Sequence, residues 1–314
     1  HPIVIVGTPS YLCVPRHDIA AIILERETSS AYRQIARPYV DMRIFAEMFS
    51  RRINAKLIFA DTFLRAETIH RTETGELSEM SHFSYHLSKT IDRQIIDARR
   101  KVDVHGDKKK WELMSSELET VVKETIGAGE HVFLFTLRKG LAPITQCGDC
   151  ESTLLCDHCQ SPLVLYKETA DKRIYSCNKC EKKFPSLMLC PTCGSWKLTT
   201  LGIGTETVAE EVQKKFPDAH MVIIDKEHTA TSKQVEKAVK DFYATPGSIL
   251  IGTELALPYL REKVATVGIV SFDSLFSVPS FKIGEKIISL VARLEEITGV
   301  HLLIQTKNID ESLI

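Results

Sequence analysis

The chain has 314 residues, 44% of them hydrophobic and 26% charged, a composition that excludes a disordered or fibrous protein and leaves room for two packed domains. Forty basic and 41 acidic residues give a net charge of −1, so no global field would draw the chain onto a phosphate backbone, and any contact with nucleic acid must be local. The sequence has no long apolar run and no secretion signal at its start, so we expect a cytoplasmic protein without a membrane partner.

The first part of the chain predicts a β-α-β unit. It opens at His1 on an apolar run that resembles a strand already under way, so we expect a fragment or remnant of something longer. Residues 19–24 and 55–60 are short, apolar and rich in branched side chains, as strands are, and the segment VDMRIFAEMFSRR between them repeats apolar residues at helical spacing. This order predicts a parallel sheet. Residues 71–114 are polar and are expected to form a connector with one amphipathic stretch.

The remainder predicts a second α/β lobe. After an acidic helix at 112–129, strand patterns occur at 131–137, 219–225, 248–253, 266–273 and 299–306, with helices near 206–216, 231–244 and 281–298. Residues 144–200 interrupt this alternation with cysteines and short strand-like pieces, so we interpret them as an inserted module. The expected domains are therefore 1–113, a partial lobe plus connector, and 114–314, a lobe interrupted by the module.

The cysteines carry the strongest signal. Eight of the nine form four C-x-x-C pairs, namely Cys147 with Cys150, Cys156 with Cys159, Cys177 with Cys180, and Cys190 with Cys193. So many cysteines would suit disulfides only outside the cell, whereas C-x-x-C is a metal-ligand spacing. Redox dithiols would explain a single pair and an iron–sulfur cluster would explain a set, but neither explains four pairs at these gaps. We therefore predict bound zinc.

The gaps predict which pairs share an ion. Seventeen residues separate Cys159 from Cys177, within the range of about 15 to 20 that is usual for one four-cysteine site. Only five residues separate Cys150 from Cys156, a poor loop for wrapping two pairs around one ion. The prediction is a nested arrangement, in which the two inner pairs hold one zinc and the two outer pairs hold another. Four thiolates fill the tetrahedron, so both zinc ions should be structural.

The cysteine module and its flanks resemble the PriA family of bacterial replication-restart helicases. FTLRKGLAPITQCGDC is similar to that family's entry into its zinc module, and LGIGTETVAEEV, SILIGTEL and FDSLFSVPSFKIGE follow in the order of its second helicase lobe. Upstream, VGTPSYLCVPRHD and SSAYRQ resemble the surroundings of its acidic ATPase motif. The resemblance implies a superfamily 2 fold with two RecA-like lobes, the first partial here, that bind ATP between them and DNA across them. It also implies a zinc module that contacts DNA and primosome proteins at stalled forks.

The residues that such a helicase uses to hydrolyse ATP are mostly missing. The sequence contains no G-x-x-x-x-G-K-[ST] phosphate loop, and the family's S-A-T-P motif is reduced to residues 60–63, Ala-Asp-Thr-Phe. With Tyr32 as the anchor, the family's D-E-E-H corresponds to Glu25, Arg26, Glu27 and Thr28, which places a cation where a carboxylate should orient water. A register shifted by one puts Leu24 at the metal position instead, so either alignment breaks the acidic pair. Ile297 and Val300 occupy the positions of arginines that would contact the transferring phosphate. We therefore expect no catalytic or ATP-binding residues and regard bound ATP and Mg²⁺ as doubtful.

Three functions stay open. The preferred hypothesis is a catalytically silent PriA-like protein that binds single-stranded or forked DNA, and primosome or single-strand-binding proteins, through residues 144–200. The alternatives are an active ATP-dependent 3′–5′ DNA helicase and a zinc-stabilised protein-interaction platform that does not bind DNA. The module's seven Lys or Arg against six Asp or Glu give it no decisive basic face. Candidate DNA contacts are Arg138, Lys139, Lys172, Arg173, Lys182, Lys183 and, as a base-stacking platform, Trp196.

Overall fold

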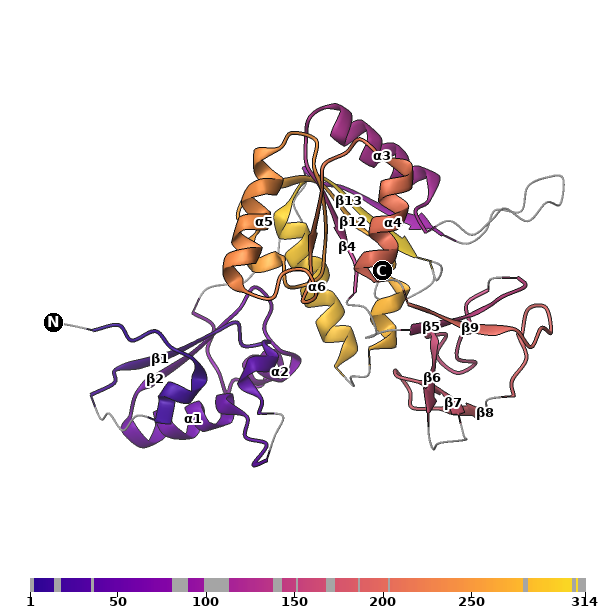
Figure 1. Cartoon of the computed structure of the whole chain (residues 1–314). Helices are drawn as coiled ribbons and strands as arrows, with labels where there is room; N and C mark the ends of the chain where they lie inside the picture. Colours follow the sequence, from indigo (N-terminus) through magenta and orange to yellow (C-terminus); the bar gives the residue numbers. More distant parts are fainter. Residues whose placement is uncertain are drawn as a thin grey trace. The chain divides into compact units, whose positions relative to one another are not determined.

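The chain folds into two compact units, residues 1–86 and 87–314 (Figure 1). The computed structural model describes residues 3–13, 18–34, 37–80, 90–98, 113–137, 143–150, 152–167, 173–185, 187–202, 204–278, 282–306 and 309. Within these residues, every helix is too short or too polar to cross a lipid bilayer.

The first unit contains the predicted β-α-β arrangement. Strands β1 (Ala21–Glu25) and β2 (Lys56–Ala60) pair in parallel, and α1 (Met42–Ile53) connects them. Asp41 caps the start of α1 by accepting a hydrogen bond from the Arg43 backbone N–H. One face of β1 packs against α1 and the other is exposed. The short helices η1 (Pro9–Cys13), η2 (Ser30–Tyr32) and α2 (Ala66–Glu73) complete this unit.

The second unit is built on a six-stranded sheet in which every neighbouring pair is parallel. Its order is β10 (Met221–Ile224), β11 (Ile249–Gly252), β4 (Val132–Phe135), β12 (Val264–Ile269), β13 (Thr298–Thr306) and β3 (Asp92–Asp97). Strands β4 and β11 are buried along their whole length, as expected for a parallel sheet that is covered on both faces.

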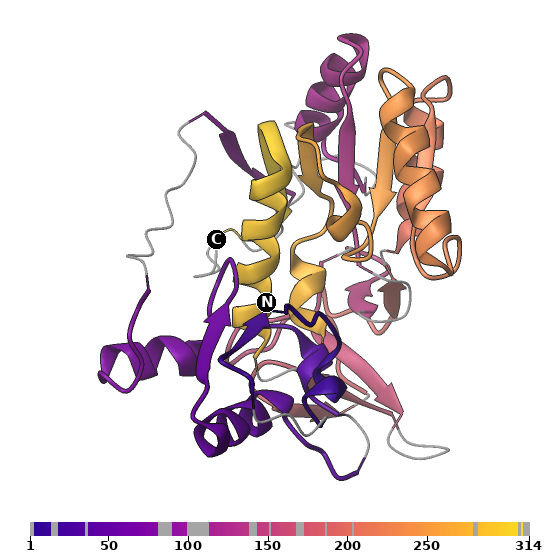
Figure 2. The ribbon, with the colours of Figure 1, turned by 90° about the vertical axis from the view of Figure 1, so that its left-hand side faces the viewer.

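Four helices cover the two faces of this sheet. Alternate residues of β4 divide between two hydrophobic clusters, because successive side chains of a strand point to opposite faces. Phe133 and Phe135 pack with α5 (Ser232–Ala244) and α6 (Ile283–Ile297), whereas Val132 and Leu134 pack with α3 (Ser116–Gly127) and α4 (Thr205–Lys215). Figure 1 shows the two helix pairs on opposite sides of the strands, and Figure 2 shows α6 running along them. The short helices η3 (Leu257–Tyr259) and η4 (Asp273–Ser277) follow β11 and β12.

Strand β3 corrects the sequence prediction for residues 71–114. These residues were expected to form a connector, yet Asp92–Asp97 pairs with β13 at the edge of the six-stranded sheet. Ile96 is the one buried residue of this strand, because an edge strand has one neighbour and a solvent-facing side. Its DRQIID sequence therefore has the polar composition of a linker. Apart from this strand, the predicted α/β fold with parallel-sheet lobes and an inserted cysteine module is confirmed.

The cysteine module is inserted in the second unit between β4 and α4. Its entry and exit strands, β5 (Pro143–Cys147) and β9 (Leu198–Gly202), pair antiparallel and form a two-stranded stem. Beyond the stem, β6 (Leu163–Lys167), β7 (Arg173–Cys177) and β8 (Lys183–Pro185) form an antiparallel meander. Because the stem brings the two ends of the insertion together, the first and last cysteine pairs meet at its tip.

Candidate metal centres

The eight paired thiols gather into two clusters of four. The outer cluster contains Cys147, Cys150, Cys190 and Cys193, the inner cluster contains Cys156, Cys159, Cys177 and Cys180, and the ligand atoms of each lie within 4.8 Å of one another. This is the nested partition that the gap lengths predict. Each cluster joins a pair from the start of the module to a pair from its end.

The sulfur positions fit tetrahedral zinc. In the outer cluster the Cys147 and Cys193 sulfurs are 3.6 Å apart and those of Cys150 and Cys190 are 3.5 Å apart. In the inner cluster the corresponding distances are 3.6 Å for Cys156 to Cys180 and 3.3 Å for Cys159 to Cys177. A tetrahedron with Zn–S bonds of about 2.3 Å has edges of about 3.8 Å, so small adjustments would admit the ion. All eight thiols are free rather than joined in disulfides.

The four C-x-x-C turns share one backbone geometry. In each turn the N–H of the first cysteine donates to the carbonyl five residues later; the acceptors are Ser152, Ser161, Lys182 and Ser195. Where the structure describes the residue after the second cysteine, it has a positive φ: 57° at Gln160, 61° at Glu181 and 71° at Gly194. This left-handed residue lets the chain turn back so that both sulfurs of a pair face the same point.

Hydrogen bonds favour the ionised form of at least one thiol in each cluster, whereas burial raises the pKa of Cys156 and Cys177 in the inner one. Burial opposes the charged form of Cys190, but the Ser152 hydroxyl and the backbone N–H groups of Cys193 and Thr192 outweigh it and lower its pKa to about 6. Burial likewise opposes ionisation of Cys159, and the Ser161 backbone N–H, together with the neighbouring Cys177 thiol, lowers its pKa to about 7. A thiolate is the form that coordinates a metal, so each cluster contains at least one group suited to start that coordination.

The candidate DNA contacts of the module divide into three groups. Trp196 is 76% exposed and Lys183 is also exposed, so both are accessible to a ligand. Lys182 is exposed too, but its ammonium lies 2.8 Å from both oxygens of Asp157, and this pairing reduces its availability for a phosphate. Arg138, Lys139 and Lys172, and the side chain of Arg173, lie outside the residues that the structure describes.

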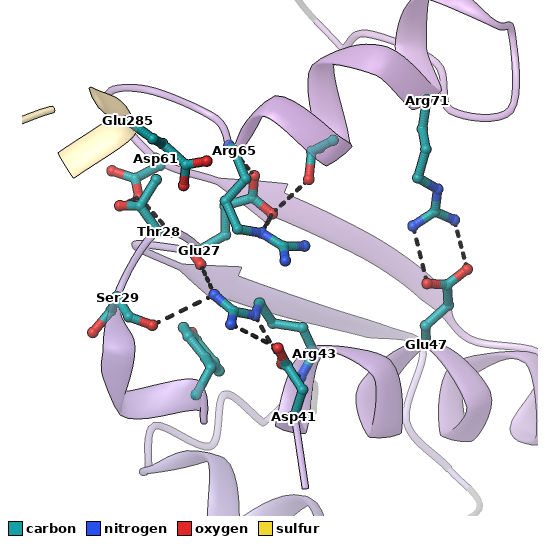
Figure 3. A network of polar contacts seen from close by, with 12 residues as sticks. Glu27, Thr28, Ser29, Asp41, Arg43, Glu47, Asp61, Arg65, Arg71 and Glu285 are labelled. Carbon is teal, nitrogen blue, oxygen red and sulfur yellow. Dashed lines mark hydrogen bonds and ion pairs between the residues drawn. The ribbon is translucent and has the colours of Figure 1, made fainter. Parts of the chain in front are cut away.

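The remnant of the acidic motif follows β1 in the first unit (Figure 3). Glu25 and Arg26 are exposed, and Arg26 has a positive φ of 54°. Glu27 is fully buried and accepts hydrogen bonds from the Arg65 backbone N–H at 2.8 Å and the Thr68 hydroxyl at 2.9 Å, with the Arg65 guanidinium at 3.4 Å. The carboxylate of Glu27 is therefore a structural tie between β1 and the start of α2. Sequence reasoning missed this role because it compared Glu27 only with a catalytic motif.

Two other polar ties support the same turn. The Thr28 backbone N–H donates to the Asp61 carboxylate at 2.9 Å, and the Thr28 hydroxyl donates to the same oxygen. These residues follow β1 and β2, so the carboxyl ends of the paired strands are joined where the S-A-T-P remnant begins. The buried Arg43 guanidinium bonds to Asp41 and to the Glu27 carbonyl, as Figure 3 shows. The motif positions thus retain contacts that stabilise the fold.

The remaining motif positions, Gly252, Ile297 and Val300, lie in the second unit, where Val300 is 47% exposed. Ile297 ends α6 and packs against the hydrophobic core, and Val300 lies in β13. A side chain at Gly252 would meet Phe133 and Ala256 at 3.2 and 3.3 Å, so packing alone explains this glycine of the SILIGTEL stretch. None of these three residues carries a charge that could contact a transferring phosphate.

The chain is similar to curated proteins described as replication restart protein PriA. It is 26% identical to the Bacillus subtilis protein over 300 residues, which cover 95% of this chain and 36% of that relative. The Haemophilus influenzae protein is 27% identical over 289 residues (91% of this chain, 38% of the relative), and the Thermotoga maritima protein is 23% identical over 316 residues (99% and 41%). The chain therefore spans less than half the length of these relatives. A comparison with models of known protein families finds no match.

Proposed function

We propose that this chain, which is similar to PriA proteins over most of its length, serves replication restart by binding rather than by motor activity. In this proposal the cysteine module holds two structural zinc ions and contacts single-stranded or forked DNA, together with primosome or single-strand-binding proteins. A cytoplasmic location is part of the proposal.

The nested thiol clusters carry the zinc part of this proposal. Four sulfurs within 4.8 Å of one another, on turns with one shared backbone pattern, suit a four-coordinate ion that leaves no position for water. Zinc bound in this way would order the module and supply no reaction chemistry. The residues of the chain would then do the binding, with Trp196 and Lys183 exposed on the module surface.

The residues at the ATPase motif positions support the proposal that this chain does not hydrolyse ATP. Glu27 is buried and bonded within the first unit, which withdraws it from solvent, and Arg26 stands where the family has a carboxylate. A cation at that position would repel Mg²⁺ and could not accept a proton from water. Ile297 and Val300 cannot replace the missing arginines.

The ATPase test of this proposal uses the zinc-loaded chain. We expect no ATP hydrolysis above background, with or without single-stranded DNA, and Arg26→Glu alone should restore none, because the other phosphate contacts stay absent. Phosphate release measured over hours, beside an active PriA as the positive control, is the assay. DNA-stimulated turnover by the chain would instead favour the active helicase.

DNA binding should depend on Trp196. Stacking on an aromatic side chain contributes about 1–3 kcal/mol per base, so Trp196→Ala is expected to weaken binding of a fluorescent single-stranded oligonucleotide by roughly 5- to 150-fold. The salt dependence of DNA binding should change little in this variant, because no phosphate contact is lost. Leu187→Ala is the matched control, since Leu187 is 91% exposed in the same module but cannot stack. Equal affinities for the two variants would contradict the role of Trp196.

A protein-interaction platform is the second candidate, and a different observation favours it. Leu187, Leu189 and Trp196 are 91%, 55% and 76% exposed, while Lys182 and Lys197 pair with carboxylates of the module. An exposed apolar surface with neutralised cations suits a protein partner better than a phosphate backbone. Absence of salt-dependent DNA binding by the zinc-loaded chain would favour this candidate over the first.

A further inference from the structure

Three of the four cysteine pairs continue as C-x-x-C-x-S. Ser152, Ser161 and Ser195 each stand two residues after the second cysteine of a pair, and the third pair has Lys182 at this place. The carbonyls of all four residues accept the same backbone hydrogen bond, which closes the turn. The serine hydroxyls are not needed for that bond, so their own contacts must be explained separately.

The Ser152 hydroxyl lies between the two halves of the outer cluster. Its oxygen is 3.0 Å from the Cys150 sulfur and 3.3 Å from the Cys190 sulfur. Cys150 belongs to the first pair and Cys190 to the last, so one hydroxyl contacts ligands from both ends of the module. A thiolate that coordinates a metal has no proton to donate, and therefore the hydroxyl would be the donor.

Ser161 has the equivalent place in the Cys156–Cys159 turn of the inner cluster. Ser161 is 1% exposed, and its oxygen forms no hydrogen bond with any residue that the structure describes. The metal-ligand candidate next to it in the same turn is Cys159, two residues earlier. Buried polar groups almost always have a partner, and a charged Cys159 thiolate would provide one.

We propose that Ser152 and Ser161 are positioning residues, one for each zinc centre, whose hydroxyls donate to a coordinating thiolate and so retain the metal. The inference rests on the zinc binding proposed above. Four thiolates leave the centre with a net negative charge in a largely buried position. A hydroxyl that donates to a sulfur offsets part of this charge and fixes the sulfur's orientation, so that a proton or a chelator displaces the ion less readily.

Ser195 provides the matched control within the same repeat. Its hydroxyl donates to the Asp149 carboxylate at 2.6 Å and accepts a bond from the Lys197 backbone N–H at 3.1 Å. The residue has the same place relative to its cysteine pair, yet its hydroxyl contacts no cysteine sulfur among the described residues. Removing this hydroxyl should therefore leave both metal centres unchanged.

The test compares Ser152→Ala, Ser161→Ala and Ser195→Ala in the full zinc-loaded chain. Zinc transfer to a chromogenic chelator should show that Ser152→Ala and Ser161→Ala each weaken the retention of one of two ions by roughly 10- to 100-fold. Ser195→Ala should match the unchanged chain, and Ser152→Thr, which keeps a hydroxyl, should restore retention. In the cobalt-substituted chain, the sulfur-to-metal charge-transfer bands should shift in the first two variants only.

The outcomes separate this inference from the proposed function. Two bound zinc ions with equal retention and equal cobalt spectra in all three alanine variants would overturn the role of the hydroxyls alone. If Ser195→Ala weakened zinc retention as much as Ser152→Ala and Ser161→Ala, the role of the hydroxyls would also be overturned, because the effect would then be a general one of the turns. An unchanged chain that takes up no zinc would overturn both.

Discussion

Replacing Cys156 and Cys177 together by serine is expected to release one of two zinc ions and unfold the inner part of the cysteine module. Both side chains are buried in the small hydrophobic cluster that Leu154, Leu163 and Tyr175 complete. A structural zinc site contributes an apparent 10–16 kcal/mol, roughly, whereas a core of this size contributes little. The variant should contain one zinc by mass spectrometry, and amide hydrogens of residues 152–185 should exchange rapidly.

The six-stranded sheet should stay folded in that variant. Its strands pack in two hydrophobic clusters that include none of the module's described residues, so amides of β4 and β11 should keep their protection. His158→Ala is the control, because His158 is exposed between two ligands and belongs to neither thiol cluster. Retention of two zinc ions by the double serine variant would contradict the inner centre, and loss of zinc from His158→Ala would make the histidine a ligand.

Replacing Glu27 by alanine should destabilise the first unit by about 3–5 kcal/mol. The change removes a fully buried carboxylate and leaves the Arg65 guanidinium and the Thr68 hydroxyl without it. A loss of this size is a large part of the stability of a small domain. Urea unfolding followed by hydrogen exchange in residues 18–80 would measure the effect separately from the second unit.

Two variants show whether burial is the cause. Glu25→Ala removes a carboxylate that is exposed at the end of the same strand, and it should change the unfolding free energy by no more than about 0.5 kcal/mol. Glu27→Gln keeps one acceptor oxygen, so its unfolding free energy should lie between those of the two alanine variants. If Glu27→Ala and Glu25→Ala had equal effects, Glu27 would not be the structural tie that its contacts indicate.

The sequence alone predicted the partition of the cysteines and most of the helices and strands. Because the gaps between the four cysteine pairs are unequal, few pairings can place four thiols around one ion. The nested pairing is the one in which the structure brings the sulfurs together. The helices of the second unit were predicted near their observed bounds because each has one apolar face that repeats with helical period.

Only the tertiary structure decided the roles of residues whose neighbours are distant in the chain. Asp92–Asp97 forms a strand because it pairs with β13, although its own composition resembles that of a linker. Glu27 has a structural role because its carboxylate accepts hydrogen bonds from Arg65 and Thr68, which lie about 40 positions away in α2 and its cap. The hydroxyls of Ser152, Ser161 and Ser195 differ in the same way, since equal local spacing places them beside different groups. Local pattern determines backbone geometry, but the partner of a polar side chain depends on which distant segments the fold brings beside it.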